Sequence, residues 1–145
     1  MVIGGHGDTT MIPLIRFANY RGVPVQELLS KKVAEQVVAD TMVGGATLTK
    51  LLGTSAWYAP GASAAVLVKS IVMDEKKVYP CCVALDGEYG QEDICIGVPA
   101  VIGKKGCEKV VKYKLNAEEM ALFEKSAAAT RKTNNILYEM NILQK

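Results

Sequence analysis

Apolar residues along the chain fall into runs whose spacing changes from one segment to the next. Residues 1–4 form a short apolar run rich in β-branched side chains, which predicts a strand. The run 11–17 is also apolar but contains Pro13, so we expect an irregular or edge strand there. A turn with a short extended piece is expected over 22–25, where glycine and proline occur together.

The segment after Ser30 has helical spacing as far as Leu52, and Ser30 is suited to cap its start. Gly44 and Gly45 lie in the middle, where two glycines cost about 2 kcal/mol relative to two alanines. We expect a kink there or close approach of another element, with two separate helices as the alternative. A loop over 53–61 and a second helix over 62–74 should follow.

The next part of the chain is typical of an antiparallel meander. Residues 77–86 are apolar at almost every position, which predicts a strand buried on both faces. A turn precedes the strand expected over 93–103, in which Pro99 indicates an edge position or a bulge. After a tight turn, the alternation over 108–115 predicts a strand with one buried face.

Asn116 is expected to cap a last helix that runs to about residue 140 and frays at its end, with Glu119 completing a variant of the capping box. Helices are thus followed by an antiparallel meander and a further helix. This order predicts the α+β class.

Composition narrows the class of protein. A chain of 145 residues with 50% hydrophobic and 22% charged residues fits one globular domain. The basic residues are scattered and the net charge is only +2, so nothing indicates binding to nucleic acid. The four cysteines form no Cys-x-x-Cys motif and are expected to be buried free thiols rather than metal ligands. No apolar run is long enough to span a bilayer and no signal peptide is visible, so we expect a soluble, cytoplasmic protein.

One short segment can carry chemistry. His6, the single histidine, lies between two apolar runs and is flanked by Gly5 and Gly7, with Asp8 close behind. An imidazole exchanges protons near neutral pH, and glycines let a ligand approach the backbone. The segment has neither the spacing of a phosphate-binding loop nor that of a nucleophile elbow. On these features alone, a turn histidine is favoured over a catalytic one.

The sequence Gly-Gly-His-Gly-Asp-Thr-Thr-Met-Ile-Pro over 4–13 resembles the active-site signature of the lactate/malate dehydrogenase superfamily. Its doubled glycine is typical of the lactate dehydrogenase-like malate dehydrogenases. Further stretches resemble the family in register, namely 44–46, 55–60, 85–90, 97–99 and 103–106. The chain departs from the common pattern in a shorter loop before Ser55 and in Trp57, where tyrosine is usual.

The resemblance implies that residues 1–145 are the C-terminal substrate-binding and catalytic domain, an antiparallel sheet packed with long helices. The NAD-binding Rossmann domain, which is N-terminal in the family, is expected to be absent from this chain, because the chain contains no Gly-x-Gly-x-x-Gly fingerprint. The family's catalytic aspartate and substrate-binding arginines also precede this segment. The polypeptide alone is therefore expected to be inactive.

The resemblance also implies roles for individual residues. His6 would take the hydroxyl proton during malate oxidation and return it during oxaloacetate reduction. Gly5, Gly7 and Asp8 would support the loop that carries it. The remaining assignments are Ser55 and Ala56 in the substrate pocket, and Pro60 against the nicotinamide of NAD, a cofactor bound mainly by the absent domain.

Two alternatives stay open. One is an L-lactate or other 2-hydroxyacid dehydrogenase domain, because the mobile loop that selects the substrate lies outside the sequence. The other is a non-catalytic oligomerisation module, because the family's substrate domain helps to build dimers and tetramers. The expected partners are malate and oxaloacetate of the tricarboxylic acid cycle, the absent Rossmann domain and further copies of the chain; no metal, nucleic acid or membrane is expected.

Overall fold

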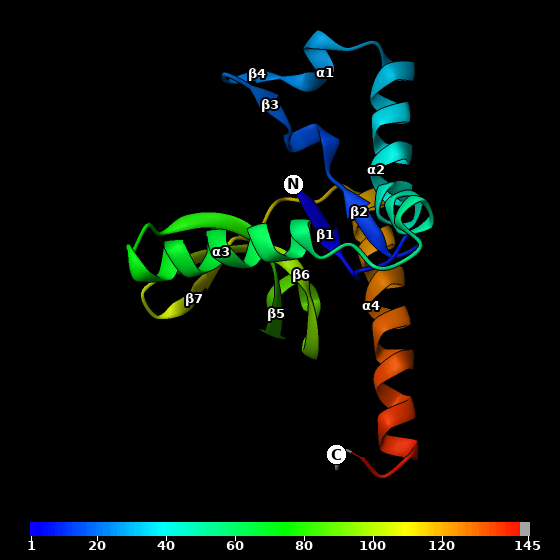
Figure 1. Ribbon diagram of the computed structural model, residues 1–145, viewed down its shortest axis with the longest axis vertical. Helices are drawn as coiled ribbons and strands as arrows, with labels where there is room; N and C mark the ends of the chain where they lie inside the picture. The colour runs from blue at the N-terminus through cyan, green and yellow to red at the C-terminus, as the bar shows by residue number, and fades with distance from the viewer. Residues whose placement is uncertain (143–145) are drawn as a thin grey trace.

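The computed structural model describes residues 1–142 and has the α+β architecture expected from the sequence (Figure 1). A five-stranded antiparallel sheet has the order β2-β1-β6-β5, with β7 also paired to β6, and β3 and β4 form a separate hairpin. The strands are β1 Val2–Gly4, β2 Met11–Pro13, β3 Asn19–Tyr20, β4 Val23–Pro24, β5 Lys77–Asp86, β6 Glu92–Gly103 and β7 Gly106–Val110. The helices are α1 Val25–Leu28, α2 Lys31–Leu52, α3 Tyr58–Val72 and α4 Ala117–Glu139, with short 3-10 helices η1 Ile15–Phe17 and η2 Glu88–Gly90.

The sheet and α4 enclose the hydrophobic core. α4 packs against β1, β2 and β6 and extends past the sheet toward the C-terminus (Figure 1). Phe123 of α4 is fully buried, which is worth about 1.5–3 kcal/mol relative to an exposed side chain. The core consists of Ile3, Ile12, Leu14, Leu85, Tyr89, Ile94, Ile96, Val98, Phe123 and Ala127.

β6 lies inside the sheet, so the edge position predicted from Pro99 is wrong. β5 pairs along one side of β6, while the other side pairs first with β1 at Gly97 and then with β7 from Ala100 onward. Pro99 falls between these two partners, where its missing N–H interrupts neither ladder. A register shift with β7 does occur, but between Val101 and Ile102.

β5 has the predicted bounds, but the expected burial of both faces is wrong. Its burial alternates: Leu85 is buried, whereas Val78 on the opposite face is 41% exposed. β5 is the last strand on its side of the sheet, and its outward residues remain exposed in this chain.

α2 confirms the cap and the continuity of the first long helix. The Ser30 Oγ accepts a hydrogen bond from the Val33 N–H, and the helix ends at Gly53 in the left-handed region. Figure 1 shows that α2 bends, with its final turns seen nearly end-on, so the predicted kink is present. A Cβ on Gly44 or Gly45 would meet no atom within 4 Å, so no other part of residues 1–142 approaches the glycines.

α3 begins at Tyr58, four residues before the predicted start, so Pro60 lies in a helix and not in a loop. Proline is tolerated in a first turn because its missing N–H would have no helical partner there. The run 11–17 is likewise divided, since β2 ends at Pro13 and a 3-10 turn follows. The hairpin β3–β4 contains the extended piece expected over 22–25, and α1 was not predicted.

The last predicted strand is shorter than expected, because β7 ends at Val110. The alternation beyond it persists without a ladder: Tyr113 and Leu115 pack inward, and Lys112 and Lys114 are exposed. Asn116 and Glu119 then form the predicted capping box. The fraying expected at the chain's end falls largely on 143–145, outside the described residues.

Candidate active site

The histidine loop connects β1 and β2 and is closed by its own backbone. The Gly7 carbonyl accepts hydrogen bonds from the Thr10 N–H at 3.0 Å and the Met11 N–H at 2.9 Å. The Thr10 hydroxyl donates to the same carbonyl at 3.3 Å. Gly7 thus has a defined place in the predicted loop as the acceptor that closes its turn.

The two glycines before His6 are required by close contacts. Gly4 has φ +92°, and a Cβ there would lie 2.5 Å from the Thr10 carbonyl oxygen. A Cβ on Gly5 would lie 2.8 Å from the Thr10 Oγ1. The doubled glycine therefore lets the two sides of the loop approach each other.

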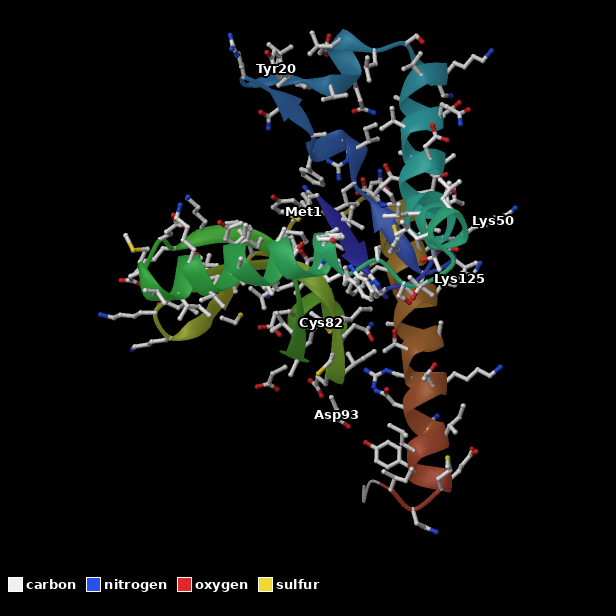
Figure 2. The ribbon with its side chains drawn as sticks, viewed as in Figure 1. Met1, Tyr20, Lys50, Cys82, Asp93 and Lys125 are labelled. Atoms are coloured by element: carbon white, nitrogen blue, oxygen red, sulfur yellow. The ribbon has the colours of Figure 1, made fainter. Side chains whose placement is uncertain are left out.

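Helix α4 anchors this loop through Ser126. The Ser126 Oγ accepts a hydrogen bond from the Gly5 N–H at 2.8 Å and donates one to the Thr10 carbonyl at 2.7 Å. Ser126 is 2% exposed, whereas its neighbour Lys125 lies on the outer side of the helix (Figure 2). The loop is thereby tied to an element more than 110 residues away in the sequence.

His6 is exposed and lines a cleft of about 310 Å³ to which β1, β2, β5, β6 and α4 contribute residues. Cys82 of β5, labelled in Figure 2, lies in the wall of the same cleft. Cys82, Cys95 and Cys107 are exposed, so the expected burial of the thiols is wrong. Partial burial, followed by the proximity of Cys95, raises the pKa of the Cys82 thiol, so this thiol is neutral at pH 7. The lining residues are Val2, Ile3, Gly4, Gly5, His6, Met11, Pro80, Cys81, Cys82, Cys95, Ile96, Gly97 and Thr130.

The cleft supplies one group for proton transfer and no fixed cation. Among residues 1–142, its lining contains no lysine or arginine, and His6 is its one imidazole. No cluster of ligands suited to a metal ion occurs within residues 1–142. Its chemistry is therefore that of an imidazole beside thiols, a hydroxyl and apolar side chains.

Asp8 is exposed, and within residues 1–142 its carboxylate has no hydrogen-bond or ion-pair partner. Ser55 is exposed in the connection from α2 to α3, Ala56 is half-buried, and Pro60 is exposed in the first turn of α3. None of these residues belongs to the described lining of the cleft. The roles predicted for Asp8, Ser55, Ala56 and Pro60 stay predictions.

Sequence patterns missed two residues that shape the site. Ser126 sits on the inward side of α4 with Phe123 and Ala127, and a polar residue in such a stripe is a signal for a buried hydrogen bond. Gly97 faces Gly4 across the β1–β6 pair, and a Cβ on Gly97 would lie 2.6 Å from the Gly4 carbonyl oxygen. The motif around Gly97 gave no indication that this glycine lines the same cleft as His6.

None of the helices described has the length and apolar content needed to cross a membrane.

Comparison with known proteins extends the likeness over nearly the whole chain. Residues 1–139 match the family model of the lactate/malate dehydrogenase, alpha/beta C-terminal domain. The malate dehydrogenase of Parabacteroides distasonis is 63% identical over 143 residues, which cover 99% of this chain and 46% of the relative. The malate dehydrogenase of Flavobacterium frigidimaris is 66% identical over 137 residues, which cover 94% of this chain and 44% of the relative.

Solved structures agree with these sequence matches. The malate dehydrogenase from Salinibacter ruber matches with a TM-score of 0.92 at 40% identity, over 97% of this chain and 46% of that one. The lactate dehydrogenase from Eimeria maxima, solved with NADH and oxamate, matches with a TM-score of 0.91 at 34% identity, over 98% and 46%. The chain spans about half the length of these relatives. It belongs to the lactate/malate dehydrogenase family, of which it forms the alpha/beta C-terminal domain.

Proposed function

We propose that this chain is the catalytic domain of an NAD-dependent malate dehydrogenase and that His6 is its proton donor and acceptor. The carrying observation is the exposed imidazole on a glycine loop, facing a cleft, in a chain of this family. In malate oxidation, the imidazole accepts the proton of the C2 hydroxyl while the C2–H bond breaks with loss of hydride and the C2–O bond becomes a carbonyl. In the reverse direction, the protonated ring donates its proton to the carbonyl oxygen of oxaloacetate.

The reaction needs groups that this cleft does not supply. Malate and oxaloacetate each carry two carboxylates, and the described lining of the cleft contains no lysine or arginine to pair with them. We infer that cationic side chains come from an N-terminal Rossmann domain in the full-length enzyme. This division fits a chain that covers 46% of its malate dehydrogenase relative.

The cofactor would be held mainly by that other domain. Pro60 is exposed on the first turn of α3, where it is free to pack against a nicotinamide ring. Ser55 and Ala56, small residues in the preceding connection, would leave room for a dicarboxylate. NAD, when bound, would accept the hydride in malate oxidation, and NADH would return it in oxaloacetate reduction, while His6 accepts or donates the proton.

Malate is favoured over lactate as the substrate. The malate dehydrogenase of Parabacteroides distasonis is 63% identical to this chain, against 34% for the lactate dehydrogenase of Eimeria maxima. We further propose that the complete enzyme is a homo-oligomer, a dimer or tetramer, working in the cytoplasm.

A chimera tests the proposed function. This chain would replace the matching C-terminal part of the Parabacteroides distasonis enzyme, and NADH oxidation would be followed with oxaloacetate. We expect turnover with oxaloacetate, and a loss of about 10²–10⁴-fold in kcat for His6→Asn. The 145-residue chain alone should give no turnover.

Two results would overturn the proposal. One is a His6→Asn chimera that keeps its activity, and the other is a wild-type chimera that does not turn over oxaloacetate. A Cys107→Ser chimera is the matched control, because Cys107 is exposed on β7 and does not line the cleft.

A further inference from the structure

The ladder between β1 and β2 stops one rung before its regular pattern requires. The pairs are Val2↔Pro13, Ile3↔Ile12 and Gly4↔Met11, and the Leu14 N–H donates to the Met1 carbonyl at 2.9 Å. In an antiparallel ladder, hydrogen-bonded pairs alternate with pairs that are not bonded. Counting from Met1 and Leu14, the next bonded pairs are Ile3 with Ile12 and then Gly5 with Thr10.

The hydroxyl of Ser126 occupies that last rung. The Gly5 N–H donates to the Ser126 Oγ at 2.8 Å instead of to Thr10, and the hydroxyl passes the bond on to the Thr10 carbonyl at 2.7 Å. A side chain from α4 is therefore inserted between two strands that would otherwise pair directly. It holds them further apart than the roughly 2.9 Å of a direct N–H···O bond.

We propose that Ser126 is a positioning residue for His6, an inference that rests on the proposed function. Gly5 is bonded directly to His6 in the chain, and Thr10 closes the other side of the same loop. By separating these two points, the hydroxyl sets the width of the loop and hence the place of the imidazole at the cleft. The hydrogen bonds of Ser126 thus fix the position of the loop relative to α4. The helix itself is held against the sheet by its buried residues Phe123 and Ala127.

Removing the hydroxyl frees the two strands to close. Ser126→Ala leaves the Gly5 N–H and the Thr10 carbonyl without their partner, and buried polar groups strongly favour being hydrogen-bonded. A direct bond between them restores the missing rung and draws His6 out of place. A displacement of about 1 Å in a reacting group can cost about 10²-fold in rate.

Ser70 provides a matched control. It is a fully buried serine on α3, and its hydroxyl donates to the Ile102 carbonyl at 2.9 Å, away from the loop. Ser126→Ala and Ser70→Ala both delete a buried, hydrogen-bonded hydroxyl from a helix that packs on the sheet. A merely structural role for Ser126 would therefore give the two variants the same kinetic behaviour.

The kinetic test uses the chimera with both variants. For Ser126→Ala, we expect kcat to fall about 10- to 100-fold while KM for oxaloacetate changes less than about threefold. Ser70→Ala should keep kcat within about twofold of wild type. Ser126→Cys keeps a weak donor and acceptor in place and should fall between them, which serves as the second variant if alanine prevents folding.

Hydrogen exchange on the 145-residue chain is the second measurement. In Ser126→Ala, the Gly5 amide should stay protected from exchange through its direct bond to the Thr10 carbonyl, while the NMR signals of this amide and of the His6 imidazole shift. Ser70→Ala should leave both unchanged. His6 is the single histidine, so its imidazole signals need no assignment.

The outcomes separate the two proposals. An inactive wild-type chimera overturns the proposed function, and the exchange data then decide on Ser126 alone. An unchanged Gly5 amide and His6 signal in Ser126→Ala, or a kcat equal to that of Ser70→Ala, overturns the positioning role.

Discussion

Gly5, the residue before His6, must lack a side chain because the side chain of Thr10 lies against it. A Cβ on Gly5 would lie 2.8 Å from the Thr10 Oγ1 and 3.0 Å from its Cβ. Such distances require the threonine or the loop to move. The second glycine of the motif is thus a steric requirement of the residue that faces it.

We expect Gly5→Ala to destabilise the chain by about 1–3 kcal/mol, because the methyl group overpacks the loop. Thr10→Ala in the same chain removes the nearer clashing atom, Oγ1, and keeps the Cβ at 3.0 Å, so it should recover part of that loss. Urea denaturation of the two single variants and the double variant gives the coupling free energy. Gly61→Ala is the control, since a Cβ there meets nothing within 4 Å, and it should be neutral or slightly stabilising. Purely additive effects would contradict the contact.

At this scale the motif alone was enough to predict His6 and the glycines beside it as candidate site residues, because they are adjacent in sequence. Ser126 escaped prediction because its contacts with Gly5 and Thr10 depend on where α4 crosses the sheet. A pattern of apolar spacing assigns a helix face, but it does not say which residue on another element that face meets.

Among the elements, an ion pair links η1 to the start of α4. The Arg16 Nε and Nη2 donate to the two Glu119 carboxylate oxygens at 3.0 and 2.6 Å. The same carboxylate accepts the Asn116 N–H in the capping box at 2.9 Å. Glu119 therefore serves both the helix terminus and the segment that follows β2.

The hydrogen bond from Arg16, followed by that from the Asn116 N–H, lowers the pKa of Glu119, although burial opposes them. A lowered pKa in the folded state means that the contribution to stability is full above the unfolded value and is lost as pH falls through the folded value. Glu119→Gln should therefore be less stable than wild type at pH 7, and the difference should shrink below about pH 4.5.

Urea unfolding at pH 7, 5 and 3 measures this difference. Glu118→Gln is the control, because Glu118 is exposed in the same helical turn and should change stability equally little at each pH. A constant gap between wild type and Glu119→Gln across this range would count against the ionised pair.

Most element positions followed from local pattern, and the errors have tertiary causes. Residues 77–86 and the cap at Ser30 were predicted correctly because spacing and capping are properties of neighbouring residues. Pro99 was misplaced because its tolerance depends on β1 ending and β7 beginning beside it. The prediction that both faces of β5 are buried was wrong because β5 also has apolar residues, such as Val78, on the face that is exposed in this chain.

Over the whole molecule, those exposed apolar faces are concentrated on α2, α3 and their connection. Leu51 is 79% exposed, Tyr58 84% and Val72 75%. Soluble proteins rarely leave extended apolar surface uncovered. In the proposed enzyme, the Rossmann domain and further copies of the chain would cover this apolar surface. This explains why elements such as β5, α2 and α3 have apolar residues at positions that are exposed in this chain.

If the N-terminal domain binds most of the cofactor, NADH should affect the thermal stability of this chain and of the chimera differently. A ligand that binds only the folded state raises its stability in proportion to occupancy. In the 145-residue chain, the one residue proposed to touch NAD is Pro60, a single apolar contact that is too small to hold a dinucleotide. Millimolar NADH should therefore leave the Tm of this chain unchanged and raise that of the chimera by several degrees.

Differential scanning fluorimetry with NADH and with AMP makes the comparison, AMP serving to detect binding through the adenosine half alone. A rise in Tm of the isolated chain with NADH would place a substantial part of the cofactor site on this domain, against the proposed division. Pro60→Ala in the chimera then localises the contact, since it should weaken the shift given by NADH and leave that given by AMP unaltered.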